Sequence, residues 1–134
     1  MKTEVVLFSS DRVLFITSKE LIVAGRSLPY AAMLPAFQSS DVTEELVTQL
    51  LSTGCIDICC VGPNAESVHD NVDDFRERNG FAVIATTWHA DTDDACEYFI
   101  HAAGGRLPLL IAVVSKHPDV CSKLVGHAIA ADQP

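Results

Sequence analysis

After residue 54 the sequence repeats one pattern three times: an apolar run of seven to nine residues, a short polar break and an amphipathic helical pattern. The apolar runs are Cys55–Val61, Phe81–Thr87 and Leu107–Ser115, and the helical patterns begin near Asn64, Asp91 and Pro118. Strands that alternate with helices of this length pair in parallel through right-handed crossovers, and such a sheet is buried on both faces. The repeat therefore predicts a three-layer α/β domain with a mostly parallel central sheet, as in Rossmann-like and flavodoxin-like folds.

Four helices are predicted from apolar periodicity and from residues that start and stop helices. The first runs from Ser40 or Asp41 to Thr53, with Asp41 as its N-cap. The second covers residues 65–79, the third about 92–103, and the fourth begins at Pro118. No linker or low-complexity tract divides the chain, so we expect one domain over residues 1–134.

The N-terminal third predicts short strands and a loop. Val5–Phe8 and Val13–Ile16 flank a polar turn, which predicts a β-hairpin that adds antiparallel strands at one edge of the sheet. Leu21–Ala24 is a short third apolar run. Because Pro29 and Pro35 bracket the next apolar residues, we expect an apolar loop or a single helical turn there, packed over the sheet.

Acidic residues are concentrated in the middle of the chain. The formal net charge is −9, and residues 41–97 hold thirteen carboxylates against Arg76 and Arg78. Such a surface repels phosphate groups, which argues against nucleic acid and anionic membranes as partners and in favour of a basic protein partner. The apolar stretch near the start is too short for a signal peptide, and no segment reaches the roughly 20 apolar residues that span a bilayer. We therefore expect a cytoplasmic protein.

Five cysteines lie at positions 55, 59, 60, 96 and 121, within predicted strands or on apolar helix faces. Their number is odd and no C-x-x-C motif occurs, which favours reduced, buried side chains that behave as small apolar residues. Adjacent Cys59 and Cys60 should point to opposite faces of their strand.

Ligands of open parallel α/β sheets bind beyond the carboxyl ends of the strands. Three loops of this sequence should emerge there: residues 62–64, 86–91 and 115–117. A small-molecule pocket is predicted from the side chains of these loops: Asn64, Thr87, Trp88, Lys116 and His117. Lys116 could meet an anionic ligand at the N-terminus of the following helix, although a solvated lysine also fits the sequence.

His89 is the candidate acid–base residue of that pocket. It should lie at a strand end with Asp91 near enough to orient its ring, which is the geometry that proton transfer requires. The alternative is a histidine that hydrogen-bonds within its loop while Trp88 packs over the core. No glycine-rich nucleotide motif, nucleophile elbow or zinc-protease motif occurs, so no cofactor is predicted.

Two helical pairs have the spacing of metal ligands, His69 with Asp73 and Glu97 with His101. Each pair supplies two ligands, fewer than the three protein ligands of a catalytic zinc site. Surface pairing explains both spacings, so no metal site is predicted.

The second and third predicted helices carry many carboxylates. Four of them recur on one side of the second helix, opposite its apolar residues. The full set is Glu66, Asp70, Asp73, Asp74, Glu77, Asp93, Asp94 and Glu97. If both helices cover one face of the sheet, these residues form a single surface for a partner. The alternative is a solvated face with ordinary helix pairs to Arg76 and Arg78.

Several short motifs resemble a group of small uncharacterised bacterial α/β proteins. They are Pro29-Tyr30-Ala31-Ala32, Cys59-Cys60-Val61-Gly62-Pro63, His69-Asp70 and Thr87-Trp88-His89-Ala90-Asp91, and the likeness spans most of the chain. The resemblance implies a bacterial cytosolic origin and no mechanism.

Two functions remain open on the sequence. The first is a non-catalytic acidic binding protein, such as an immunity or inhibitor protein that neutralises a basic toxin or nuclease by electrostatic steering and occlusion. The second is a small enzyme or ligand-binding domain that uses the strand-end loops, with His89 as its acid–base residue.

Overall fold

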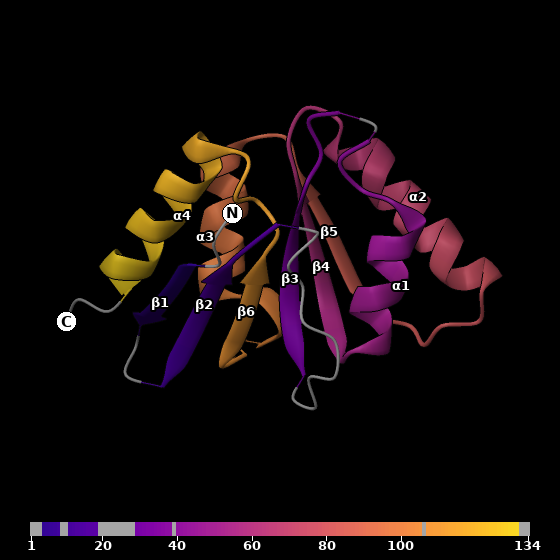
Figure 1. Cartoon of the computed structure of the whole chain (residues 1–134), viewed down its shortest axis with the longest axis horizontal. Coiled ribbons are helices and arrows are strands. Elements are labelled where there is room, and N and C mark those ends of the chain that lie inside the picture. Colours follow the sequence, from indigo (N-terminus) through magenta and orange to yellow (C-terminus); the bar gives the residue numbers. More distant parts are fainter. Residues whose placement is uncertain (1–3, 9–10, 19–28, 39, 106, 132–134) are drawn as a thin grey trace.

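The computed structural model describes residues 4–8, 11–18, 29–38, 40–105 and 107–131, and its sheet has the strand order β1-β2-β6-β3-β4-β5 (Figure 1). The strands are β1 (Glu4–Phe8), β2 (Arg12–Ile16), β3 (Tyr30–Pro35), β4 (Cys55–Val61), β5 (Ala85–His89) and β6 (Leu109–Ala112). The helices are α1 (Glu44–Ser52), α2 (Ala65–Arg78), α3 (Thr92–His101) and α4 (Pro118–Ala131), with a 3₁₀ turn, η2, at Ala103–Gly105.

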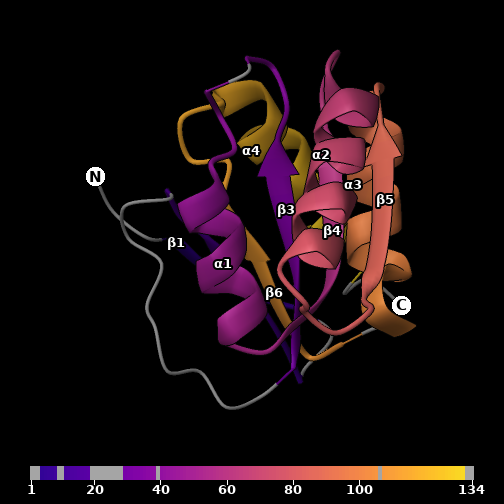
Figure 2. The same ribbon diagram turned by 90° about the vertical axis from the view of Figure 1, so that its right-hand side faces the viewer.

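The domain has three layers, with α1 and α2 on one face of the sheet and α3 and α4 on the other (Figures 1 and 2). Strands β2, β6, β3, β4 and β5 pair in parallel along the whole row. The predicted three-layer α/β fold with a mostly parallel sheet is therefore confirmed, and the three apolar runs contribute β4, β5 and β6 in the same direction.

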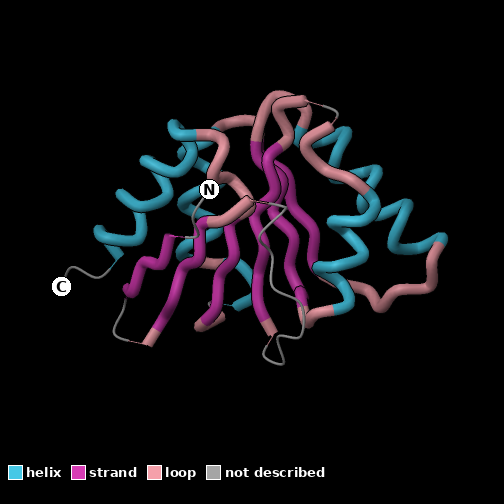
Figure 3. The backbone as a smooth tube through the Cα atoms, in the orientation of Figure 1, coloured by secondary structure: helices cyan, strands magenta, loops and turns pink. Residues whose placement is uncertain are grey.

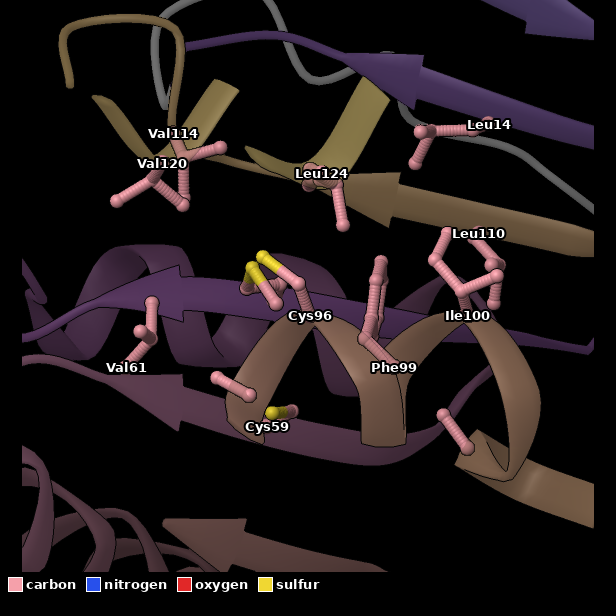
Figure 4. Close-up of a cluster of buried hydrophobic side chains, with 14 of the residues drawn as sticks. Leu14, Cys59, Val61, Cys96, Phe99, Ile100, Leu110, Val114, Val120 and Leu124 are labelled. Carbon is pink, nitrogen blue, oxygen red and sulfur yellow. The ribbon is translucent and has the colours of Figure 1, made fainter. Parts of the chain in front are cut away.

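Each face of the sheet has its own apolar core. On one side Phe99 and Ile100 of α3 and Leu124 of α4 pack over Leu14 and Leu110 of the sheet (Figure 4). All five side chains are at most 1% exposed. Burying a side chain of this size contributes about 1.5–3 kcal/mol, so this cluster holds both helices on the sheet.

The opposite core is built from the apolar stripes of α1 and α2. Leu46 and Leu50 of α1 and Val68 and Val72 of α2 pack against Ile58 of β4. In each helix the two residues are four apart, a spacing that places side chains on one face of a helix. The stripes that the sequence predicts for both helices therefore face the sheet.

The N-terminal hairpin differs from its prediction. Strand β1 pairs antiparallel with β2, with Glu4 opposite Ile16, but β2 lies parallel to β6. The expectation that the hairpin adds antiparallel strands is thus wrong for β2, which belongs to the parallel set. The buried guanidinium of Arg12, at the start of β2, donates to the carbonyl of Ile100 in α3 and to the carbonyl of Leu107 just before β6, and these bonds hold the start of β2 beside the amino end of β6.

The prediction for the segment between Pro29 and Ala36 is also wrong. This segment forms the central strand β3 instead of an apolar loop or a helical turn. All six residues of β3 are buried, so the strand lacks the alternation of apolar and polar residues by which a half-exposed strand is recognised. Pro35 is its last residue, a position where a missing N–H is tolerated. The apolar run Leu21–Ala24 lies outside the described residues.

Several boundaries move by a few residues. Strand β5 covers Ala85–His89 instead of Phe81–Thr87, and Val83 in the preceding segment is 85% exposed. Strand β6 ends at Ala112, three residues before the predicted end. Helix α1 begins at Glu44 because Thr43 accepts from the N–H of Leu46 as its N-cap, the role predicted for Asp41.

Candidate functional site

The loops that follow β3, β4 and β6 meet at the carboxyl edge of the sheet (Figure 3). Phe37, after β3, stacks on the ring of His117, after β6, with centroids 4.7 Å apart and an interplanar angle of 21°. The side-chain amide of Asn64, after β4, donates to the carbonyl of Phe37 at 3.1 Å. The structure thus brings Asn64 and His117 to one rim, as parallel strands require.

Two local features shape this rim. Asp41 Oδ2 accepts from the N–H groups of Phe37 and Gln38, both at 2.9 Å, and lies 4.0 Å from Nε2 of His117. Gly62 has φ +135°, and a Cβ built there would lie 2.7 Å from the carbonyl oxygen of Ala36. The glycine therefore permits the close approach of the β3 and β4 loops.

A cavity of about 180 Å³ opens between the loops after β2, β3 and β6. Its lining residues are Ser18, Pro35, Ser40, Asp41, Val113, Ser115, Lys116 and His117. Strands β3 and β6 are neighbours, yet β3 continues to α1 on one face of the sheet while β6 continues to α4 on the other (Figure 1). This divergence is the topological switch point, where open α/β sheets bind their ligands.

Comparison with protein families gives a match over most of the chain. A family model described as a domain of unknown function (DUF7684) covers residues 18–124. The chain belongs to this family. No curated protein matches the sequence. The DUF7684 match spans every residue that lines the switch-point cavity, and it confirms a family of unknown function for the resemblance noted in the sequence.

In this DUF7684 domain Asp91 and His89 each make contacts other than the expected pairing. Asp91 is the N-cap of α3, and its Oδ2 accepts from the N–H of Asp94 at 3.1 Å. The ring of His89 lies against Tyr98, with centroids 5.4 Å apart, and its buried Nε2 has no hydrogen-bond partner among the described residues. Asp91 is therefore engaged with the backbone of α3 through one oxygen, and its pairing with His89 stays a prediction.

Strand alternation separates the other predicted pocket residues. Thr87 and His89 face the α3 side of the sheet, whereas Thr86 contacts α2 and Trp88, two residues later, lies on the same side. Trp88 is 42% exposed. Thr87 and Trp88 therefore do not line the cavity that contains Lys116 and His117.

Asp57 is a buried polar residue whose environment the sequence did not predict. It is 1% exposed, and its Oδ2 accepts from the Tyr98 hydroxyl and from the N–H of Gly104, both at 2.7 Å. Burial, with a contribution from the hydrogen bond to Asp57, raises the pKa of Tyr98. The available signal was a single carboxylate inside the apolar run Cys55–Val61.

The cysteines are free thiols, as expected, and Cys59 and Cys60 face the two opposite cores. Burial raises the pKa of Cys55, Cys60 and Cys96 to about 12. Burial also raises the pKa of Cys59. The thiolate is the reactive form, so these side chains are protonated and unreactive at neutral pH.

Helix α2 contacts the edge strand β5 through a polar cluster. The Thr86 hydroxyl donates to Oδ1 of Asp73 at 3.0 Å and lies 3.1 Å from Nε2 of His69, whose Nδ1 lies 3.0 Å from Oδ1 of Asp70. His69 and Asp73 are thus engaged with β5. Within the described ranges, no three His, Cys, Asp or Glu side chains are grouped so that they could hold a metal ion.

The eight predicted partner-binding carboxylates do not form one surface, because α2 and α3 cover opposite faces of the sheet (Figure 2). Asp93 faces α4, where Lys123 Nζ donates to it at 2.9 Å. Asp74 pairs with Arg78 at 2.8 Å, and both line an open groove of about 410 Å³ between α1 and α2. Asp94 and Glu97 are exposed on α3.

The four carboxylates left on α2 form what we call the acidic stripe: Glu66, Asp70, Asp73 and Glu77. Asp73 joins the stripe to Thr86, so the stripe runs beside strand β5. Glu66 and Glu77 are exposed and make no ion pair with any described residue. No helix in the described parts of the chain has the length and apolarity needed to cross a lipid bilayer.

Proposed function

We propose that this chain is a non-catalytic acidic binding domain that captures a basic protein partner on its α2–β5 side. An immunity or inhibitor protein that neutralises a basic toxin or nuclease in the bacterial cytoplasm is the form of this function that we favour. The observation that carries the proposal is an edge strand bordered by the acidic stripe: Thr86 of β5 donates to Asp73 of α2 at 3.0 Å.

The edge strand supplies the backbone part of the proposed interface. β5 pairs with β4 and, in the described part of the chain, with no second strand, so one row of its N–H and C=O groups is unpaired. An extended segment of a partner can add to such an edge. Trp88 is 42% exposed on this strand, and large aromatic side chains often carry much of the binding energy of an interface.

The acidic stripe makes the proposed interface selective for a basic partner. Asp70 is 69% exposed, and Glu66 and Glu77 are also exposed, so their fields extend into solvent. Carboxylates arranged in this way accelerate the approach of a basic partner and repel an acidic one. Asp73 accepts a hydrogen bond from Thr86 of β5, and Asp70 lies 3.0 Å from Nδ1 of His69 on its own helix.

Charged residues beside an edge strand also discourage two copies from pairing edge to edge. The two roles make different predictions. If the stripe only protects the edge, its removal should promote self-association without affecting any partner. If the stripe recruits a partner, its removal should abolish capture.

The test is affinity capture from the native cell with a charge-reversed double variant, Asp70→Lys with Glu77→Lys. The matched control is Glu45→Lys with Asp119→Lys, which changes the net charge equally at exposed positions outside the acidic stripe. We expect the wild type and the control to retain one basic protein, and the stripe variant to lose it. Retention of that protein by a folded stripe variant would refute the proposal.

A second candidate function, small-molecule binding, is favoured by the cavity at the switch point and its convergent polar residues. The enzymatic version, with His89 as acid–base residue, has weaker support because His89 lies against Tyr98 and does not line that cavity. Its test is His89→Ala, which should remove any turnover or any ligand-induced rise in Tm. An unchanged response would exclude His89.

A further inference from the structure

We propose that the switch-point cavity binds a compact oxyanion, carried as the phosphate or carboxylate group of a small molecule. The inference is independent of partner capture by the acidic stripe, which belongs to α2 and β5. It deepens the second candidate function by naming the chemistry of the ligand.

Ser18 is the first observation. It is one of the residues that line the cavity, it is 3% exposed, and its buried hydroxyl has no hydrogen-bond partner among the described residues. A buried hydroxyl without a partner is unfavourable, and native structures seldom keep one unless water or a ligand satisfies it. An oxyanion in the cavity would accept the hydrogen bond that Ser18 can donate.

The charges around the cavity select an anion. Lys116, a cationic residue, is part of the lining, and α4 begins two residues later at Pro118. The N-terminus of a 14-residue helix carries partial positive charge and attracts negatively charged groups. Lys116 and the N-terminus of α4 therefore both favour a negatively charged ligand in the cavity.

Asp41 narrows the choice of anion. Among the described residues it is the one carboxylate in the lining, and two N–H groups already donate to its Oδ2. A carboxylate tolerates a neighbouring anion best when that anion also carries a hydrogen-bond donor. Hydrogen phosphate and a small α-hydroxycarboxylate both meet this condition.

The size of the cavity excludes larger ligands. Its volume of about 180 Å³ is below the roughly 300–1,000 Å³ of sites that enclose drug-sized molecules. A nucleotide would therefore not be enclosed. The bound group is a single phosphate or a short hydroxy acid, or the end of a longer molecule that extends into solvent.

The experiment is an NMR titration of the full chain with three probes: inorganic phosphate, glycolate and, as an uncharged control, glycerol. We expect one or both anions to shift the amide signals of Ser18, Ser115, Lys116 and His117, and glycerol to shift none of them. Shifts with phosphate alone would identify a phosphate site, and shifts with glycolate alone would identify a carboxylate site. Shifts with both anions would identify a general oxyanion site. Absence of shifts with both anions would overturn the proposal.

Two variants test the residues that carry the argument. Lys116→Gln should weaken anion binding about tenfold or more, the typical value of a charge-assisted hydrogen bond. Its control is Lys123→Gln, which removes an exposed lysine of α4 that pairs with Asp93 of α3 and does not line the cavity; this variant should leave binding unchanged. Equal affinity of the two variants would overturn the role of Lys116 and the proposal with it.

Ser18→Ala is the sharper test because it should affect two measurements differently: the Tm of the free protein and its affinity for the anion. The Tm of the free protein should stay the same or rise, since the substitution removes an unsatisfied buried hydroxyl. Affinity for the anion should fall about fivefold, the value of one ordinary hydrogen bond. If Tm falls and the affinity is unchanged, the hydroxyl serves the fold alone and the proposal fails.

Discussion

The hydroxyl of Tyr98 donates to Oδ2 of Asp57 at 2.7 Å, and through this bond α3 is fixed to a carboxylate in the middle of strand β4. The N–H of Gly104, at the end of the same helical segment, donates to the same oxygen at 2.7 Å. Asp57 is 1% exposed. A buried carboxylate requires such donors, so this pair ties the position of α3 to the sheet.

Tyr98→Phe should lower the free energy of unfolding by about 1.5–3 kcal/mol, because a hydrogen bond to a buried charged group is lost. Urea denaturation measures the change. The control is a double-mutant cycle with Asp57→Ala, in which Tyr98→Phe should cost much less. An equal cost in both backgrounds would mean that the hydroxyl acts through something other than Asp57.

Gly62→Ala should destabilise the protein by about 1–3 kcal/mol or more, through a strained φ and a backbone clash. Its φ is +135°, and the added Cβ would lie 2.7 Å from the carbonyl oxygen of Ala36. Gly126→Ala is the matched control, since nothing lies within 4 Å of the added Cβ on helix α4. The control should stabilise the protein by about 0.5–1 kcal/mol. Thermal denaturation measures both changes in stability, and changes of the same sign for the two variants would contradict the account.

The buried thiols predict a loss of stability at alkaline pH. The pKa of Cys55 and of Cys60 rises from 9.0 to about 12 on burial. Below pH 9 both thiols are protonated in the folded and unfolded states, so their contribution to stability is fully present. Between pH 9 and 12 the unfolded thiols ionise first, and the free energy of unfolding should fall by about 1.4 kcal/mol per thiol per pH unit.

Cys60→Ala isolates one of these thiols. Urea denaturation between pH 9 and 11 should give a slope that is smaller than that of the wild type by one proton. The cavity left by the sulfur lowers stability at every pH, and this offset does not affect the slope. An unchanged slope would show that Cys60 is not protonated in the folded state over this range.

Thr86→Val should lower the free energy of unfolding by about 0.5–1.5 kcal/mol, since the hydroxyl donates to Asp73 and lies within hydrogen-bond distance of His69. Thr48→Val is the control because Thr48 is exposed on α1. Its effect should be close to zero. Equal urea midpoints for both variants would indicate that the α2–β5 polar cluster does not stabilise the fold.

The sequence predicts those elements in which apolar residues recur at a regular spacing. Helices α2, α3 and α4 show a regular apolar stripe and recognisable end residues, and their starts at Ala65, Thr92 and Pro118 agree with the structure. Strand β3 was not predicted because it is buried on both faces and flanked by prolines, so it has no alternation. The parallel pairing of β2 with β6 joins segments that are far apart in the sequence, as do the hydrogen bonds of Arg12, and no local pattern encodes either.

In the candidate sites, too, residues that follow from local sequence were predicted and residues placed by the tertiary fold were not. Lys116 and His117 were predicted because they follow a strand in the sequence. Ser18 and Asp41 were not, because the tertiary fold alone places them beside β6. The carboxylates of α2 and α3 were predicted as one surface, but strand order puts the two helices on opposite faces, and strand order depends on long-range pairing.

The most direct test of the proposed function is hydrogen–deuterium exchange on the protein with its captured basic partner bound. The account predicts that amides of β5 and of α2 exchange more slowly in the complex than in the free protein, while those of residues 113–117 are unchanged. Slower exchange confined to other surfaces, with β5 and α2 unaffected, would contradict it.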